Sequence, residues 1–445
     1  MIPDSATLQK LLVEAVRDHN VLPLTGRCNL SCCFCSHGQN PPGTQAYDFP
    51  AVEEWRLLEL AAYLDPAKKI VIGESATRLR EGEPLTHPQF TAILKQLRKN
   101  FPETPLQLTT NGSLLTKPVI ELLASLAPLE LIVSLNSAGV RGRRLLMNDP
   151  QPLQAARALD QLNAAGIPLH GSVVALPHLA GWDDLEQTLL FLNNAGAQTI
   201  RLLLPGFTRL SNPALLPPPD FLARCRCLAG ELRAVLNAPL LLEPAPIDHL
   251  EPVIEGALPG SPAAAAGLCA GDLIMSVDQV KPATRVEAFN AARRKRNPTV
   301  RFLRGGSRLE ALLPKQRGES PGFIVSYDLD PDQVERVRRY LSPGRESLML
   351  TSPAALERWQ WARDQFNLAG LCLLAVPSKF FGGSINCAGL LTVIDFLSVL
   401  EHEKDAVFNQ QVLIPAAAFD RGGRDMQGRH YSILQQTGAL ITLVE

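Results

Sequence analysis

Between residues 19 and 204 the chain alternates short runs of β-branched or aliphatic residues with longer amphipathic segments, and this alternation strongly limits its possible folds. The amphipathic segments have helical spacing, as at Phe90, Ile93, Leu94 and Leu97. Six such alternations predict a parallel sheet with right-handed crossovers, either an open α/β sheet or an incomplete (β/α) barrel. In both folds, chemistry takes place at the carboxyl ends of the strands. The predicted strands are Val21–Leu24, Lys69–Gly73, Leu106–Thr109, Leu129–Leu135, His170–Ala175 and Thr199–Leu204.

The length of 445 residues predicts about three units with cores of ordinary size. We expect the α/β unit over residues 1–210. A linker with three consecutive prolines and one helix follows over 211–249, because the prolines interrupt the alternating pattern. Short strands and Gly-containing turns predict a small mostly-β domain over 250–316. Mixed helical and strand patterns predict an α+β domain over 317–445.

The charges of the chain are balanced, with 43 basic and 44 acidic residues. No global field therefore favours a charged partner, and we expect no nucleic acid and no membrane surface among its ligands. No stretch reaches the roughly 18 apolar residues that a membrane span needs. The first 15 residues also lack the basic and continuous apolar regions of a signal peptide. These features predict a cytoplasmic protein.

Four of the nine cysteines, Cys28, Cys32, Cys33 and Cys35, fall within eight positions directly after the first predicted strand. Thiolates are soft ligands that suit zinc or iron-sulfur clusters. Structural zinc usually needs four ligands in two pairs, and no second CxxC or HxxxH occurs downstream. Three cysteines can hold a four-iron cluster that keeps one iron open for another ligand. A three-cysteine zinc or redox loop is the alternative.

The spacing of Cys28, Cys32, Phe34 and Cys35, C-x3-C-x-aromatic-C, resembles the signature of the radical S-adenosylmethionine (SAM) superfamily. The resemblance implies that the three cysteines hold a [4Fe-4S] cluster whose open iron chelates SAM. Reduction of the cluster would then cleave SAM to methionine and a 5'-deoxyadenosyl radical, which abstracts hydrogen from a substrate. It also implies an oxygen-sensitive oxidoreductase. Cys33 lies outside the family pattern.

Later segments add to this resemblance in the order of the strands. Glu81–Pro88 resembles the family's GGEP motif, with Glu81 in place of the first glycine and an extra stretch, Glu74–Arg80, before it. Thr109–Gly112 resembles the TTNG turn, where Asn-Gly suits a positive φ. Ser134 and Asn136, at the fourth predicted strand, are expected to share one face because they are two positions apart. The implied SAM contacts are Phe34, Gly82, Glu83, Pro84, Asn111, Ser134 and Asn136. The implied fold is a partial (β/α)6 barrel over roughly residues 20–205.

The run from Pro259 to Asp278 resembles bacterial PDZ domains, which bind extended peptides by adding a strand to a sheet edge. The preceding residues 250–258 contain no clear carboxylate-binding loop. The domain is therefore either a peptide-binding module or a rigid module that supports the barrel.

Taken together, these segments resemble a family of predicted iron-sulfur oxidoreductases fused to PDZ, which shares a Gly-rich run similar to Phe380–Gly383. We expect a radical SAM enzyme that receives electrons from flavodoxin or ferredoxin. The PDZ-like domain favours a peptide or protein substrate, whereas biosynthetic relatives favour a small cofactor precursor. A PDZ-type adapter with a structural or redox-sensing iron-sulfur or zinc site is the alternative function.

Overall fold

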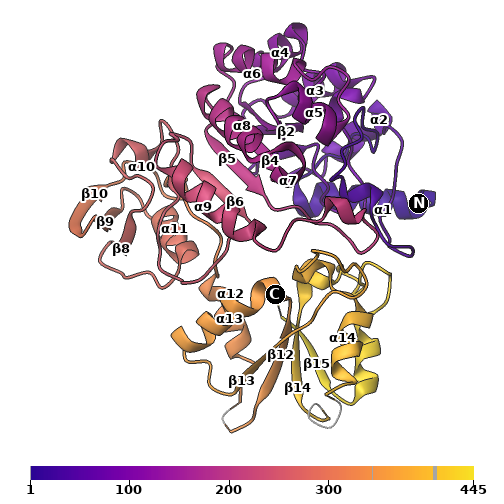
Figure 1. The fold of residues 1–445 in the computed structure, drawn as a ribbon, viewed down its shortest axis with the longest axis vertical. Helices are drawn as coiled ribbons and strands as arrows, with labels where there is room; N and C mark the ends of the chain where they lie inside the picture. The colour runs from indigo at the N-terminus through magenta and orange to yellow at the C-terminus, as the bar shows by residue number, and fades with distance from the viewer. Residues whose placement is uncertain (1, 343, 404–407, 445) are drawn as a thin grey trace. The chain divides into compact units, whose positions relative to one another are not determined.

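The computed structural model describes residues 2–342, 344–403 and 408–444 (Figure 1). These residues form two compact units. The first contains residues 2–38, 45–205 and 217–243, and the second contains 39–44, 206–216 and the described residues from 244 onward. Within the described residues, no helix has the length and apolar character required to cross a membrane.

The first unit is built on a six-stranded sheet in which neighbouring strands follow chain order and are all parallel, as the alternating sequence predicts. Five of the six predicted runs form its strands. The first run, Val21–Leu24, contributes only a bridge between Val21 and Val71. The strands are β1 Ile70–Ile72, β2 Leu106–Thr110, β3 Leu129–Ser134, β4 Leu169–Val174, β5 Thr199–Leu203 and β6 Leu240–Glu243.

The sixth strand comes from the segment that the sequence predicted to be a linker. β6 pairs with β5, and helix α9 packs Phe221, Cys225 and Leu232 into the same core as the other strands. The α/β unit therefore extends to Glu243 and not only to residue 210. Two apolar elements continue the core after the prolines, so the interruption in the pattern marks a long connection and not a domain end.

Alternate residues of each strand face opposite sides of the sheet. On one side, side chains such as Ile72, Leu108 and Val133 are at most 1% exposed and pack into the core that the helices share. The other side carries partly buried polar side chains, among them Gln107 and Arg201. The helices are α1 Ser5–His19, α2 Glu54–Ala61, α3 Phe90–Asn100, α4 Lys117–Ala124, α5 Val140–Met147, α6 Gln154–Ala164, α7 Pro177–Ala180, α8 Trp182–Asn194 and α9 Phe221–Arg233.

In the second unit, the mostly-β region has its own core, which includes Ile254, Phe302 and Phe323. It extends beyond the boundary predicted at residue 316, because β11 pairs antiparallel with β7. Helix α11 begins at Arg285. The elements are β7 Gly256–Ala257, α10 Pro262–Ala265, β8 Leu273–Val277, α11 Arg285–Arg294, β9 Thr299–Arg304, β10 Ser307–Leu312 and β11 Phe323–Ile324.

The C-terminal region contains a four-stranded sheet in the order β13-β12-β14-β15, with all strands parallel. Helices cover both sides: Leu350 packs against the core that contains α14, whereas Met349 packs against α12 and α13. The region combines helices and strands, as the sequence predicts. The elements are α12 Pro331–Arg338, β12 Ser347–Thr351, α13 Pro353–Gln365, β13 Leu371–Ala375, α14 Val393–Leu400, β14 Gln411–Pro415 and β15 Leu440–Val444.

The Gly-rich run of the C-terminal region makes a close backbone approach. A Cβ on Gly383 would overlap the carbonyl oxygen of Phe207, and Ser384 N donates to that same oxygen at 2.8 Å. The partner is the segment that follows β5, and residues 206–216 fold as part of the second unit.

Candidate cofactor site at the carboxyl ends of the strands

The predicted site residues of the first unit gather at one edge of its parallel sheet. The cysteine loop follows the short segment that bridges to β1, the Gly82–Pro84 segment follows β1, and Asn111 follows β2. Ser134 is the last residue of β3. Carboxyl ends of parallel strands share an edge, which brings these separate segments together.

The three cysteines of the motif lie in one short turn of the cysteine loop. Cys28 is exposed, whereas Cys32 and Cys35 are half-buried, and Cys35 N donates to Cys32 O at 3.1 Å. Burial, together with the nearby Cys28 and Cys35 thiols, raises the pKa of the Cys32 thiol to about 12. The three thiols thus lie near one another in a partly desolvated place.

These thiols have the donor chemistry of an iron-sulfur site. Among the described residues, no group of three His, Cys, Asp or Glu side chains is placed to hold a single metal ion. In a [4Fe-4S] cluster, each cysteine binds a different iron, which requires soft donors spread around one loop. Cys28, Cys32 and Cys35 fit that requirement in ligand type and in lying on one loop.

Gly82 allows the segment after β1 to pair closely with the start of the cysteine loop. Gly82 N donates to Thr25 O, and Glu83 N donates to Arg27 O, each at 2.8 Å. A Cβ on Gly82 would overlap the carbonyl oxygen of Arg27. The backbone approach therefore requires glycine at this position, next to Cys28.

The side chain of Glu83 bonds to the neighbouring strand end. Its carboxylate accepts from Thr110 Oγ1 and from Asn111 N, both at 2.7 Å, and from Leu85 N at 3.3 Å. Burial raises the pKa of this carboxyl to about 7, an effect that the hydrogen bonds from Asn111 and Thr110 oppose. Glu83 thus joins the segment after β1 to the turn after β2. Pro84 follows it as a buried residue at the start of a 3-10 turn.

Asn111 extends this link to the cysteine loop. Its Nδ2 donates to Asn29 Oδ1 at 3.0 Å and lies 3.9 Å from Cys28 Sγ. Its Oδ1 accepts from Ser113 N at 2.9 Å, and Gly112 has a φ of +78°, as the Asn-Gly pattern predicts. A continuous set of hydrogen bonds therefore connects Glu83, Asn111 and the loop residue beside Cys28.

Ser134 and Asn136 do not share a face as the strand pattern predicted. β3 ends at Ser134, and Asn136 has a φ of +58°, which breaks the alternation. The Asn136 amide is 4% exposed and is used within the fold: it accepts from Val174 N at 2.8 Å and donates to Ser134 O at 3.2 Å. Phe34 is half-buried in the turn that carries the cysteines.

Two features at this edge were not predicted from the sequence. The extra stretch before the motif pairs with the chain after the cysteine loop, since Tyr47 N donates to Arg78 O and Arg80 N donates to Tyr47 O. Glu81 is 7% exposed, and neither of its carboxylate oxygens has a hydrogen-bond partner. Burial raises the pKa of Glu81 well above its ordinary value. Its only signal in the sequence was the replacement of a glycine.

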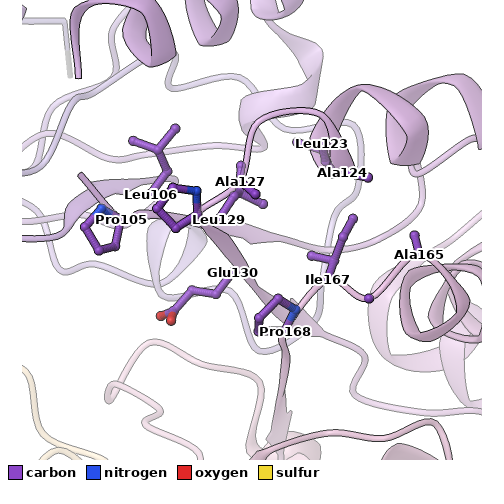
Figure 2. A pocket seen from close by; sticks show the side chains of 12 residues that line it. Pro105, Leu106, Leu123, Ala124, Ala127, Leu129, Glu130, Ala165, Ile167 and Pro168 are labelled. Carbon is purple, nitrogen blue, oxygen red and sulfur yellow. The ribbon is translucent and has the colours of Figure 1, made fainter. Parts of the chain in front are cut away.

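A cavity of about 380 Å³ lies at the opposite, amino end of the same sheet (Figure 2). Its lining comes from the loops that lead into β2, β3 and β4 and includes Leu106, Pro128, Ile167 and Pro168. Glu130 is the one acidic side chain among its lining residues. None of the predicted cofactor residues takes part in it.

In the mostly-β region, β11 runs beside α11. The rings of Phe323 and Phe289 meet edge to face with centroids 5.8 Å apart. At one end Gly318 N donates to Arg293 O, and at the other the Asp328 carboxylate accepts from Arg285 N at 2.8 Å. The pairing of β11 with β7 joins residues more than 60 positions apart. Local sequence patterns therefore did not reveal it.

Two family models match the chain. Residues 22–192 match the Radical SAM superfamily, and residues 253–300 match the PDZ domain. The first match covers the cysteine loop and β1 to β4 with the helices between them.

Curated relatives match part of the chain. A GTP 3',8-cyclase of Paenarthrobacter nicotinovorans is 30% identical over 33% of this chain and 39% of its own length. A tungsten-containing aldehyde ferredoxin oxidoreductase cofactor-modifying protein of Pyrococcus furiosus is 33% identical over 24% of this chain and 27% of its own. The crystal structure of Streptococcus suis SuiB bound to S-adenosylmethionine has a TM-score of 0.37 and 19% identity, over 54% of this chain and 55% of that one. The chain thus spans well under half the length of the curated relatives named here.

Proposed function

We propose that this chain, which carries a radical SAM domain over residues 22–192 and a PDZ domain over 253–300, is a radical SAM enzyme with Cys28, Cys32 and Cys35 as the ligands of its [4Fe-4S] cluster. Such a cluster supplies the electron that cleaves SAM to methionine and a 5'-deoxyadenosyl radical, which abstracts hydrogen from a substrate. The observation that carries this proposal is the hydrogen-bonded link from Glu83 through Asn111 to the cysteine loop. It joins the three motif segments at one edge of the sheet.

The residues around the loop have separate tasks in this proposal. Gly82 leaves room for close backbone pairing beside Cys28, and Glu83 fixes the turn that contains Asn111. The half-buried side chains of Phe34 and Ser134 are left to contact SAM. An exposed Cys28 also implies an oxygen-sensitive cluster. Among the described residues no disulfide joins any of the nine cysteines, which suits a reducing compartment such as the cytoplasm.

The polar side of the sheet supports a polar substrate. Ser134, Ser172 and Arg201 occupy one row across β3, β4 and β5 by the register of the strands. Arg201 Nε donates to Glu243 Oε1 at 2.9 Å, and their side chains are 40% and 33% exposed. Hydrogen-bonding groups therefore line the sheet from the expected SAM edge inward. A substrate that is rich in donors and acceptors matches that lining.

Anaerobic reconstitution with iron, sulfide, dithionite and SAM tests the proposed chemistry. We expect 5'-deoxyadenosine from the wild-type protein and only baseline product from Cys32→Ala. Cys33→Ala is the matched control, because Cys33 is the adjacent thiol outside the motif, and we expect it to retain product. A verified four-iron preparation that yields no more 5'-deoxyadenosine than Cys32→Ala would overturn the proposal. Calorimetry with SAM on the same preparation separates an enzyme from an adapter, which would show no binding.

The substrate is either a small biosynthetic molecule, which the partial similarity to GTP 3',8-cyclases supports, or a peptide that the PDZ domain binds. The arrangement of β11 beside α11 supports the second, because peptides join PDZ domains between a strand and a helix. A peptide array on the full chain tests it. We expect Phe289→Ala to reduce any specific signal and Val280→Ala, an exposed residue of the same domain, to leave it unchanged. An equal signal from the wild-type chain, Phe289→Ala and Val280→Ala would rule out a peptide substrate bound beside α11.

The electron donor is proposed to be a low-potential protein such as flavodoxin or ferredoxin. Clusters of this type reach low potentials, so a strong reductant is needed. Replacement of dithionite by reduced flavodoxin or ferredoxin in the same assay should support product formation.

A further inference from the structure

Arg143 and Asp149 form an ion pair that is completely buried beside the cysteine loop. Both side chains are 0% exposed, and Arg143 Nε donates to Asp149 Oδ2 at 2.7 Å while Nη2 lies 2.6 Å from the same oxygen. A buried ion pair contributes little net stability, because desolvation of both charges offsets their attraction. Stability alone is therefore a weak reason for such a pair, and its other contacts matter more.

The guanidinium of Arg143 connects two strand ends at the candidate site. Nη1 donates to Leu135 O at 2.9 Å, just after β3, and Nη2 donates to Asn111 O at 3.1 Å, just after β2. Asn111 is the residue whose Nδ2 lies 3.9 Å from Cys28 Sγ. Arg143 thus holds in place the turn that contacts the first cysteine of the motif.

The segment that contains the pair also contacts the cysteine loop directly. Cys33 N donates to Leu146 O at 2.9 Å, and Asn148 Nδ2 donates to Ser31 Oγ at 3.1 Å. Residues 143–149 therefore make two hydrogen bonds directly to the cysteine loop and a third to Asn111. Together these three bonds fix the segment relative to the loop.

The positive charge lies close to the cysteine loop. The Arg143 guanidinium donates to Asn111 O, and Nδ2 of the same asparagine lies 3.9 Å from Cys28 Sγ. A positive charge near the loop favours a gain of negative charge there. Asp149 opposes this effect, because it pairs with the guanidinium and carries the opposite charge.

We propose that the Arg143–Asp149 pair is a positioning element that fixes the Asn111 turn against Cys28 and sets the reduction potential of the cluster that the cysteine loop holds. This inference rests on the proposed function, since it requires a cluster on Cys28, Cys32 and Cys35. One-electron reduction of a cluster adds a negative charge, and hydrogen bonds and charges near the sulfurs shift its potential. Arg143 raises that potential and Asp149 lowers it. The pair acts on the loop through the turn that contains Asn111, so both are positioning residues.

An anaerobic redox titration of the reconstituted protein, followed by electron paramagnetic resonance, tests the pair. Dithionite supplies the electrons, and iron and sulfide content are measured first. We expect Arg143→Met to shift the midpoint potential to more negative values and Asp149→Asn to shift it to more positive values. Arg143→Lys keeps the charge but cannot reach all three acceptors, so we expect a smaller negative shift and an altered resonance spectrum. Arg144→Met, at the next and exposed position of α5, is the matched control and should change neither.

The opposite signs separate this role from general loosening of the fold, which would move both variants in one direction. Shifts of the same sign, or no shift at wild-type cluster content, would overturn the inference while leaving the proposed function intact. If Arg143→Met does not fold, the midpoint potentials of Arg143→Lys and Asp149→Asn still test whether the two positions shift the potential in opposite directions. A wild-type protein that holds no cluster and makes no 5'-deoxyadenosine would overturn the proposed function, and the inference with it.

Discussion

The two ends of the parallel sheet in the first unit differ: one end has a cavity, and the other has the side chains that can bind a cofactor. The amino end has the cavity of about 380 Å³, with mostly apolar walls and the single acidic residue Glu130 (Figure 2). The carboxyl end has the three cysteines of the motif and two buried carboxyls, Glu81 and Glu83. The cavity is the more obvious hollow, yet the groups that can bind a cofactor lie at the other end.

The hydrogen bonds explain this difference. At the carboxyl end, side chains that follow different strands bond to each other's backbone, as Glu83 does to Asn111 N. At the amino end, Glu130 pairs with Lys69 at the surface, with side chains 23% and 41% exposed. Preorganised donors near unpaired thiols indicate function more strongly than volume does. Substitutions at the two ends of the sheet therefore test this difference.

The largest difference is expected between Gly82→Ala and Gly166→Ala. At Gly82 a Cβ would overlap Arg27 O, so the loop that carries Cys28 must move. We expect the free energy of unfolding to fall by roughly 1–3 kcal/mol. We also expect the variant to lose the cluster. At Gly166, which lines the amino-end cavity, no atom lies within 4 Å of a Cβ, and only its φ of +68° is strained. We expect a cost of about 1 kcal/mol there and full iron content.

Iron and sulfide analysis after reconstitution, together with thermal unfolding, measures both variants. Equal iron content in the two would show that close backbone approach at Gly82 is not needed for the cluster.

The same comparison shows what the sequence could predict. The cysteine spacing, the strand-helix alternation and the Asn-Gly turn are local patterns. They predicted most of the strands correctly, and Cys28 and Asn111 follow strand ends as expected. Their meeting at one edge followed from a general property of parallel sheets. Local signals were sufficient because each of these features is specified by residues within a few positions of one another.

Features that depend on distant residues were not predictable in this way. β6 joins the sheet across a Pro-rich connection, and its four residues have no period of their own. Asn136 takes a positive φ that a strand pattern does not reveal, and its amide reaches Val174 on the next strand. The pairing of Arg143 with Asn111 O likewise depends on a fold already formed. Tertiary contacts decided each of these cases.

Glu83→Gln is expected to change the pH dependence of stability. The pKa of the buried Glu83 carboxyl is raised from its ordinary value of 4.5 to about 7, so the folded state binds this proton more tightly than the unfolded state. The associated stability is complete below pH 4.5 and is lost as pH rises through 7, by at most roughly 3 kcal/mol. The glutamine variant lacks this titration.

We therefore expect the free energy of unfolding of wild-type protein without cluster to fall relative to Glu83→Gln between pH 4.5 and 8, as urea unfolding at a series of pH values would show. Glu81→Gln should also flatten the profile, because burial raises the pKa of Glu81. Parallel profiles for wild type and Glu83→Gln would contradict the assignment. At any single pH, Glu83→Gln also replaces an acceptor opposite Asn111 N by a possible donor, which costs about 1–3 kcal/mol.

The smallest effect is expected from Glu130→Gln at the amino end. This change removes the surface pair with Lys69, which is worth at most about 1 kcal/mol because both side chains are partly exposed. It leaves every hydrogen bond at the carboxyl end in place, so we expect wild-type yields of 5'-deoxyadenosine and an unfolding midpoint within a few degrees of wild type. A large loss of product from Glu130→Gln, with normal folding, would show that the cavity in Figure 2 takes part in the chemistry. The contrast between the two ends would then have to be abandoned, because a surface ion pair gives no other route from Glu130 to the cysteine loop.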